Sequence, residues 1–437
     1  MTIPLKVLAL VVAVVPAVGV AQAEFDECLG RLREAAVAQG VSAATADRVL
    51  PTVRQLPRVV EADRSQPEFV ETFATYLARR VTPQRVAAGR ARLEQHRALL
   101  SRVSTEHGVP PQVLVALWGL ETNFGTVLGN VPVFDSLATL ACDGRRGAYF
   151  TSEFVNALHI VERGIDERRM IGSWAGAMGQ TQFMPSVYLE HAVDADGDGV
   201  ADLWESVADA FASAASFLRS LGWQRGWRWG REVLLPEGFD YALAGRDRAR
   251  SLEEWHRLGV TTTDGRPISA LPEKAALLVP AGRRGPAFLV YENFDVLMRW
   301  NRSEHFALAV GILSDRIAGG DGLRVPPPND PPLTREQVAA LQKKLNELGF
   351  DSGEPDGVLG SATRRAVREW QIRNGLVADG YVDVELLRSL DISLRWSSAQ
   401  PLSATFSSDD TPTSRMPLGV CRVYRTVRFL RSISVQV

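Results

Sequence analysis

A proline-dense stretch divides this chain of 437 residues into parts that must fold separately. Prolines stand at 326–328 and again at 331–332. Proline fixes φ and removes a backbone donor, so such a segment favours extended, semi-rigid backbone over helix. We therefore predict a linker at 321–332, with a large unit before it at 24–320 and a compact unit after it at 333–391.

The large unit has the apolar spacing of helices. Leu29, Leu32 and Ala36 recur at intervals of three and four, which places them on one helical face. Short β-like stretches interrupt the helical pattern at 232–235 and 288–291. Hydrophobic residues make up 46% of the chain and charged residues 23%, so real cores are expected. The sequence predicts a mainly α fold with minor β.

The N-terminus has the composition of an export signal. Lys6 precedes an apolar run over 7–20, which ends in the small residues Ala21 and Ala23. A positive region, an apolar stretch and a small-x-small site are typical of a cleavable signal peptide. We predict a signal at 1–23 and a periplasmic location. The alternative is an uncleaved anchor, although the run is shorter than the roughly 20 residues of a membrane span.

The cysteine count allows one disulfide and leaves one thiol over. The three cysteines are Cys28, Cys142 and Cys421, and an oxidising compartment permits pairing. Cys28–Cys142 is the favoured bridge because both residues lie in the large unit. Buried free thiols are the alternative. No Cys-x-x-Cys or Cys/His cluster indicates zinc.

One carboxylate stands on an otherwise apolar helix. Two prolines at 110–111 suit the first turn of a helix that extends to Gly125, and Glu121 is its only charged residue. Glu121 shares a face with Leu117 and Trp118. Desolvation favours the protonated carboxyl, so its pKa should rise and the group could donate a proton. The alternative is a frayed-end glutamate that points to solvent, and the helix pattern alone does not decide between them.

A second segment, 172–186, combines glycines with amides and is called here the glycine–amide segment. Its glycines would let backbone approach a ligand closely. Three of its polar side chains can bond sugar hydroxyl and acetamido groups: Ser173, Gln180 and Gln182. Tight helix–loop packing is the alternative, and it would explain the glycines but not the amides.

Taken together, 118–125 and the glycine–amide segment resemble the membrane-bound lytic transglycosylase B family, whose catalytic domain is lysozyme-like. Shorter matches occur at 142–146, 223–230, 292–294 and 301–303. The resemblance implies that Glu121 is the sole catalytic residue. It also implies a set of substrate-binding residues, with aromatic side chains at three positions where the family commonly has tyrosine (217, 300 and 306). The set is Ser173, Gln182, Met184, Phe217, Trp300, Asn301 and Phe306.

The resemblance implies a lyase reaction on peptidoglycan. Glu121 would protonate the β-1,4 bond between N-acetylmuramic acid and N-acetylglucosamine, and then accept the proton of the muramic C6 hydroxyl as a 1,6-anhydro ring closes. No second protein carboxylate and no cofactor would be required. Alternatives are a hydrolytic muramidase and a catalytically silent wall-binding scaffold.

The sequence also contains a complete calcium-loop pattern. Asp194, Asp196 and Asp198 alternate, a glycine stands at the sixth position, and Glu205 stands at the twelfth. These carboxylates and the Val200 carbonyl can surround a calcium ion.

Helical patterns at 186–193 and 202–219 flank this loop. The alternative is an acidic turn that starts the second helix and binds no metal. Any calcium here would be structural, since a lyase that uses Glu121 needs no metal. A calcium sensor is a poor reading, because the lone loop lies among the other motifs.

The compact unit resembles the peptidoglycan-binding domain type 1, a small three-helix module. A capping box is expected at Thr334 and Gln337. Further features that carry the resemblance are Leu341, Gln342, Phe350, Asp356-Gly357, Trp370-Gln371 and Asp379-Gly380. The expected partner is therefore the glycan strand of peptidoglycan, either in the periplasm or associated with the wall.

Residues 392–437 are rich in serine, threonine and proline at first, and then alternate arginines with apolar residues. We expect a disordered tail, with a basic segment that touches an anionic surface as the alternative. A formal net charge of −2 gives no electrostatic case for nucleic acid. Proteins that synthesise the wall or regulate its hydrolases are further candidate partners.

Overall fold

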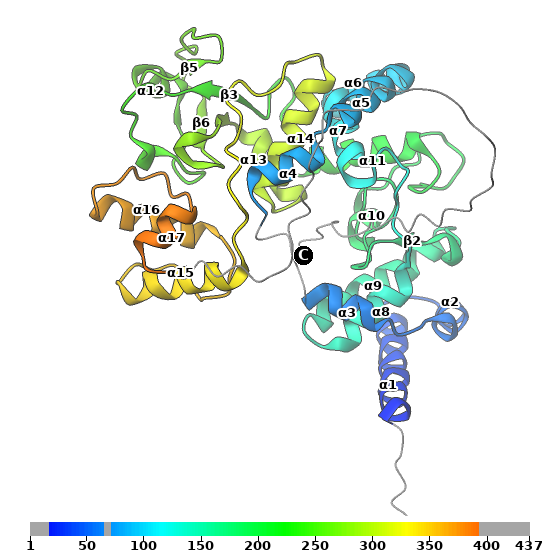
Figure 1. Cartoon of the computed structure of the whole chain (residues 1–437). Coiled ribbons are helices and arrows are strands. Elements are labelled where there is room, and N and C mark those ends of the chain that lie inside the picture. The colour runs from blue at the N-terminus through cyan, green and yellow to red at the C-terminus, as the bar shows by residue number, and fades with distance from the viewer. Residues whose placement is uncertain (1–16, 65–70, 393–437) are drawn as a thin grey trace, which may run out of the picture.

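A computed structural model describes residues 17–64 and 71–392 of the chain. Helices dominate it, with a five-stranded sheet on one side and a separate helical module beside that sheet (Figure 1). The prediction of a mainly α fold with minor β is confirmed.

The first group of buried side chains, the N-terminal core, includes Leu32, Phe154 and Met178. α1 starts at Ala17 and so runs through the expected cleavage point after Ala23. The helices that contribute to this core are α1 (Ala17–Ala38), α2 (Ala43–Val49), α3 (Pro57–Arg64), α8 (Val133–Asp143), α9 (Gly147–Glu162) and α10 (Pro185–His191).

A disulfide between Cys28 and Cys142 ties α1 to the last turn of α8, with the two Cα atoms 6.0 Å apart. This is the pair that the sequence favours. The third cysteine, Cys421, lies outside the described residues. The bridge joins positions 114 residues apart, so it restricts a long stretch of the unfolded chain.

Replacing Cys142 with serine is expected to lower the free energy of unfolding by about 2–5 kcal/mol, because the unfolded chain regains the entropy of that loop. Thermal denaturation of the oxidised protein measures the effect. Cys421→Ser is the matched control and should leave the midpoint unchanged. Equal midpoints for Cys142→Ser and the parent chain would contradict a bridge.

The central core includes Leu100, Leu114, Phe211 and Leu308. Its helices come from three separate stretches of the chain, and α14 packs directly on α7. They are α4 (Phe73–Arg80), α5 (Pro83–Gln95), α6 (Arg97–His107), α7 (Pro111–Thr122), α11 (Val207–Ser220), α13 (Glu292–Trp300) and α14 (Glu304–Ile317). These helices hold the candidate site.

An antiparallel five-stranded sheet in the order β4-β6-β7-β3-β5 covers a third core with α12 (Leu252–Arg257). The expected β-like stretches correspond to β3 and β7. β6 was not foreseen because four of its five residues are buried, so the sequence lacks the alternation that marks a half-buried strand. The strands are β3 (Gly230–Leu234), β4 (Arg250–Ser251), β5 (Thr261–Thr262), β6 (Lys274–Leu278) and β7 (Ala287–Val290), while β1 (Val131–Pro132) pairs with β2 (Ile171–Gly172).

The C-terminal module has three helices, α15 (Arg335–Glu347), α16 (Ser361–Arg373) and α17 (Val384–Ser389). The expected capping box of Thr334 and Gln337 is present at the start of α15. Two buried glutamines then hold the two Asp-Gly turns. The Gln342 Oε1 accepts from the Gly357 N–H at 2.9 Å, and the Gln371 Oε1 accepts from the Gly380 N–H at 2.8 Å.

Ion pairs hold this module against the large unit. The Arg284 guanidinium lies 2.8 Å from the Asp330 carboxylate in the linker and 3.2 Å from the Asp383 carboxylate in the module. Arg364 on α16 lies 3.2 Å from Glu304 on α14. The linker is therefore part of an interface between the two units.

The expected signal segment falls largely on residues 1–16 and the expected disordered tail on 393–437, which lie outside the described residues. In the ranges that the structure describes, no helix combines the length and apolarity needed to cross a membrane.

Candidate active site

Glu121 lies on the last turn of α7, a helix whose residues 113–120 are all buried. The helix ends at Thr122, three residues before the expected Gly125. The Glu121 side chain is half-buried, and its Oε1 accepts a hydrogen bond of 2.8 Å from the Trp300 Nε1. The carboxylate is thus held in place, and the alternative of a frayed-end glutamate in solvent is wrong.

Trp300 joins the two cores at this point, because its ring packs against both. The ring centroid lies 5.6 Å from that of Phe183 and 5.3 Å from that of Phe217. His191 stacks on Phe217, with ring centroids 4.9 Å apart. An indole N–H can only donate a hydrogen bond. The packing of these rings therefore fixes the direction from which the Trp300 N–H donates to Glu121.

The end of α7 is braced to the glycine–amide segment. The Trp118 Nε1 donates to the Gln180 Oε1 at 2.9 Å, and the Thr122 hydroxyl donates to the Gln180 carbonyl at 2.8 Å. A Cβ added to Gly125 would lie only 2.6 Å from the Gln180 Oε1. Gln180 is therefore a buried structural brace, and both ends of its amide are bonded within the protein.

The glycines of that segment serve packing within the protein. A Cβ at Gly172 would lie 2.1 Å from the Ala177 carbonyl oxygen, and one at Gly179 would lie 2.8 Å from the Leu203 carbonyl oxygen. Gly179 also has φ +70°, which L side chains rarely adopt. Tight packing, the alternative considered from the sequence, accounts for these glycines.

Unusual backbone gathers around Glu121. Within 17–64 and 71–392, four non-glycine residues have positive φ, and three of them belong to this region: Asn123 at 50°, Phe124 at 60° and Gln182 at 52°. Such conformations cost free energy and persist where the surrounding structure imposes them, often at functional sites. All three residues lie within the two motifs at 118–125 and 172–186.

The two polar atoms of the Gln182 side chain have different surroundings. Its Nε2 donates to the carbonyls of Gly179 and Leu128, at 3.0 and 3.2 Å. Its Oε1 is buried and finds no hydrogen-bond partner among the described residues. An unpaired buried acceptor is costly, and the described residues supply no donor to it.

The other expected sugar-binding residues lie in more enclosed positions. The buried Ser173 Oγ accepts from the backbone N–H of Ala177 at 3.1 Å. Met184 caps α10 and is buried in the N-terminal core. The Asn301 Oδ1 accepts from the Ser303 N–H at 3.0 Å, and Phe306 is buried on α14. Of the predicted set, Trp300 and Phe217 are the aromatic residues that the structure gathers next to Glu121.

One supporting residue was missed from the sequence. Glu153 on α9 is buried, with 3% of its surface exposed. Its carboxylate accepts from the Ser186 hydroxyl at 2.6 Å and from the Ser186 N–H at 2.9 Å. A carboxylate at a helix N-terminus is favourable, so Glu153 fixes the start of α10 and the end of the glycine–amide segment. A single acidic residue in a helix gives no signal of such a distant role.

The calcium-loop residues form a compact acidic turn. The Asp194 carboxylate accepts from the N–H groups of Gly197 and Gly199, at 2.7 and 2.9 Å. The Asp198 carboxylate accepts from the Val200 N–H at 2.9 Å. These bonds shape the loop around its own backbone.

The acidic residues that converge differ from the expected ligand set. Carboxylate oxygens of Asp194, Asp196 and Asp209 lie within 4.8 Å of one another. Glu205, the expected twelfth-position ligand, instead lies 2.9 Å from Arg169. α11 begins at Val207 rather than near 202, and Asp209 lies in its first turn.

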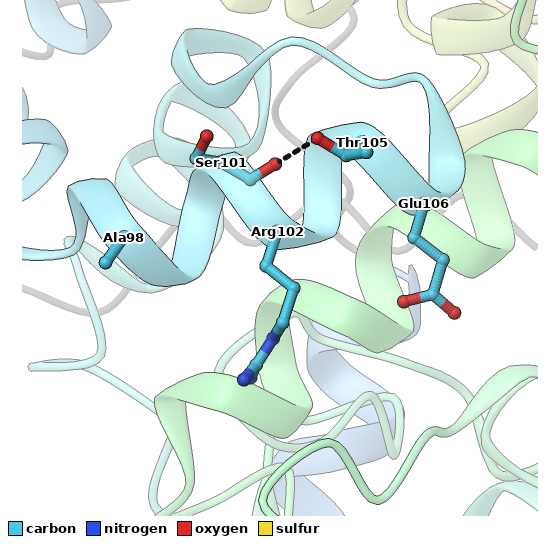
Figure 2. Close-up of a pocket in the computed structure, with 5 residues that line it drawn as sticks. All are labelled: Ala98, Ser101, Arg102, Thr105 and Glu106. Carbon is cyan, nitrogen blue, oxygen red and sulfur yellow. Dashed lines mark hydrogen bonds between the residues drawn. The ribbon is translucent and has the colours of Figure 1, made fainter.

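A pocket of about 520 Å³ lies along α6 and shares no residue with this site. Figure 2 shows its wall, with Ser101 and Thr105 joined by a hydrogen bond and with the Arg102 and Glu106 side chains extending away from α6. It is lined by this one helix and offers no convergent polar groups. We do not assign it to the chemistry of Glu121.

Comparison with known proteins places this arrangement in a family. The transglycosylase SLT domain model matches residues 24–315. The chain belongs to this family. A model described as a putative peptidoglycan binding domain matches residues 334–390. The resemblances predicted from the sequence are confirmed, as is the lysozyme-like character of the large unit.

Two relatives show the extent of the similarity. The membrane-bound lytic murein transglycosylase B of Escherichia coli is 33% identical over 250 residues, which are 56% of this chain and 66% of that protein. SltB3 from Pseudomonas aeruginosa, whose crystal structure was solved in complex with NAG-anhNAM-pentapeptide, is 45% identical to this chain, with a TM-score of 0.81. The match covers 84% of this chain and 99% of that chain.

A third relative bears on the acidic loop. The lytic transglycosylase Slt35 of Escherichia coli, solved in complex with calcium, is 28% identical with a TM-score of 0.57. The match covers 67% of this chain and 92% of that chain.

Proposed function

We propose that this chain is a lytic transglycosylase that cleaves the β-1,4 bond between N-acetylmuramic acid and N-acetylglucosamine in peptidoglycan. The observation that carries the proposal is the Glu121 carboxylate, half-buried at the end of a buried helix and bonded to Trp300 at 2.8 Å. Family membership and the peptidoglycan-binding module identify the polymer.

In the first step Glu121 acts as the acid. Its carboxyl proton passes to the glycosidic oxygen, and the bond from that oxygen to C1 of the muramic residue breaks. The carbonyl oxygen of the substrate's own 2-acetamido group stabilises the positive C1. The negative charge that develops on Glu121 is stabilised by the Trp300 N–H, a donor already in position.

In the second step Glu121 acts as the base. The C6 hydroxyl of the muramic residue attacks C1 and its proton passes to the Glu121 carboxylate. The products are a free 4-hydroxyl on N-acetylglucosamine and a 1,6-anhydro ring, with no water consumed. The reaction therefore differs from that of a two-carboxylate glycosidase.

Digestion of purified sacculi followed by mass spectrometry of the soluble muropeptides tests this proposal. We expect 1,6-anhydro ends. Reducing ends, 18 mass units heavier by the addition of water, would instead identify a hydrolytic muramidase. Binding without release would identify a silent scaffold and would overturn the enzymatic assignment.

The proposal also assigns a role to each part of the chain. A signal at 1–23 would export the protein to the periplasm, the unit at 24–320 would perform the chemistry, and the module at 333–391 would hold the enzyme on the wall. Residues 321–332 would link these two units. Wall-synthesis proteins and hydrolase regulators, the further candidate partners, would meet the protein in that compartment.

We further propose that the acidic loop holds a structural calcium ion through Asp194, Asp196 and Asp209. The donor chemistry fits, because calcium prefers several carboxylate and carbonyl oxygens in a flexible cage. The likeness to a relative solved with calcium supports the assignment. Neutralising three converging carboxylates would remove their mutual repulsion and stabilise the start of α11.

Calcium is expected to raise the thermal midpoint of the protein relative to EDTA. The stabilisation should reach about 2.7 kcal/mol at a calcium concentration a hundred times the Kd. Asp209→Asn should abolish this calcium-dependent shift, whereas Glu205→Gln should retain it. A shift that is lost in Glu205→Gln and kept in Asp209→Asn would instead support Glu205 as the ligand, as predicted from the sequence. The absence of any shift in the parent chain would exclude calcium.

A further inference from the structure

One aromatic side chain is exposed on the loop between α11 and β3. Trp227 has 41% of its surface exposed, and within 17–64 and 71–392 it is the only exposed tryptophan, tyrosine or phenylalanine. Its loop neighbours Gln224, Arg225 and Arg228 are exposed as well. A ligand that covers an indole removes a large apolar area from water, and tryptophan is enriched where binding energy concentrates.

The loop that presents Trp227 is held in place by a buried amide. Asn293 lies in the first turn of α13 and is fully buried. Its Oδ1 accepts from the Gln224 N–H at 2.7 Å, and its Nδ2 donates to the carbonyls of Gln224 and Trp227, both at 2.9 Å. The Trp227 ring also lies 6.5 Å from the Tyr291 ring, between centroids. A ligand would meet an indole already in position, so less conformational freedom is lost on binding.

The helix α13 connects Trp227 with the candidate active site. Tyr291, the ring next to Trp227, is the N-cap of this helix, and Trp300, which bonds Glu121, is its last residue. The helix has nine residues, so at 1.5 Å per residue it is about 13 Å long. A glycan strand that follows the helix from Glu121 would therefore reach Trp227 after a few sugars.

Polar side chains line α13 between these two ends. Glu292, Asp295 and Arg299 are spaced by three and four residues, so they share one face of the helix. The Glu292 carboxylate also accepts a hydrogen bond from the Gln224 side-chain amide. Carboxylate, amide and guanidinium groups can bond the hydroxyl and acetamido groups of a sugar, whereas the C–H face of its ring is apolar and packs on an indole. The surface offers both kinds of contact.

We propose that Trp227 stacks on a sugar of the glycan strand several units away from the bond at Glu121. The site takes the apolar face of an N-acetylhexosamine ring, with Gln224 and Glu292 beside it as partners for hydroxyl groups. The assignment rests on the proposed action on peptidoglycan. It gives the large unit a preference for long strands over short fragments.

Cleavage of long and short glycan substrates tests the site, both without peptide stems so that only sugars contribute. Trp227→Ala should raise KM on long strands roughly tenfold. It should leave kcat unchanged, because a contact far from the reacting bond is the same in the ground state and the transition state. On the shortest fragment that is cleaved, the variant should match the parent chain. An unchanged KM on long strands, or an equal rise on both substrates, would overturn the site.

Two further variants serve as controls. Trp227→Tyr keeps an aromatic face and should recover most of the lost affinity for long strands. Leu271→Ala removes another exposed apolar side chain, with 45% of its surface accessible, and should leave KM unchanged on both substrates. A rise in Leu271→Ala as large as that in Trp227→Ala would count against a specific site. The thermal midpoint of Trp227→Ala should match that of the parent chain, because the bonds from Asn293 involve only the loop backbone.

Oxidation of tryptophan by N-bromosuccinimide, mapped by mass spectrometry, measures the contact without cleavage. In a Glu121→Gln background, Trp227 should oxidise readily in the free protein and several-fold more slowly with a long strand bound. The short fragment should give no protection. Unprotected Trp227 in the presence of the long strand would overturn the site even if sacculi are cleaved as proposed. Protection would support the site even if sacculi yielded no anhydro product.

Discussion

Glu121→Gln is expected to lower the release of soluble muropeptides from sacculi by about 10²- to 10⁴-fold. The amide keeps the size of the side chain and can still accept from the Trp300 N–H, which bonds Glu121 at 2.8 Å. It cannot give a proton to the glycosidic oxygen or take one from the C6 hydroxyl. Both steps of the proposed reaction should therefore fail while the fold persists.

Sedimentation with sacculi and thermal denaturation are the controls. Both should match the parent chain, because the module and the cores are unchanged. Glu190→Gln provides a matched variant, since Glu190 is a carboxylate with 74% of its side chain exposed on α10. It should keep full activity. Full activity in Glu121→Gln would remove Glu121 from the chemistry.

Trp300→Phe is expected to reduce kcat by about 10²-fold, since removal of one donor to a developing charge costs roughly that factor. The phenyl ring keeps the contacts to Phe183 and Phe217 but lacks the N–H. A hydrogen bond to the charged form favours that form, so its loss favours the protonated carboxyl. Because the first step uses the protonated form, the alkaline limb of the pH profile of kcat/KM should move to higher pH.

Phe217→Leu distinguishes this role from packing alone. That change disturbs the ring contacts and leaves the indole N–H in place, so it should alter KM without moving the alkaline limb. Trp300→Tyr restores a donor and should recover part of kcat. A pH profile that is identical in Trp300→Phe and the parent chain would reduce Trp300 to a packing residue.

Local patterns predicted much of this fold. The apolar run placed Glu121 at the end of a buried helix, the β-like stretches located β3 and β7, and the capping box set the start of α15. Each of these features depends on residues within a few positions of one another. The sheet was only partly predicted, because β6 is buried on both faces and β4 and β5 are two residues long. Neither situation leaves a periodic signal.

The site was predicted as a collection of residues rather than as a set of contacts. The bond from Trp300 to Glu121 joins positions 179 apart, and nothing local to either residue indicates it. Gln180 was expected to bind sugar, yet its amide is used by Trp118 and by the Trp204 carbonyl. Asp209, which belongs to the proposed calcium site, lies outside the 194–205 loop pattern and converges with Asp194 and Asp196 only in the folded chain.

The ion pairs of Arg284 restrict how far the module can move from the large unit. Arg284 pairs with Asp330 and with Asp383 at once, so a glycan strand bound by the module would lie at a restricted distance from Glu121 while both pairs hold. Cleavage should then occur at a regular number of sugars from the site at which the module binds the strand. Lengthening the linker would leave that number unchanged for as long as these pairs hold.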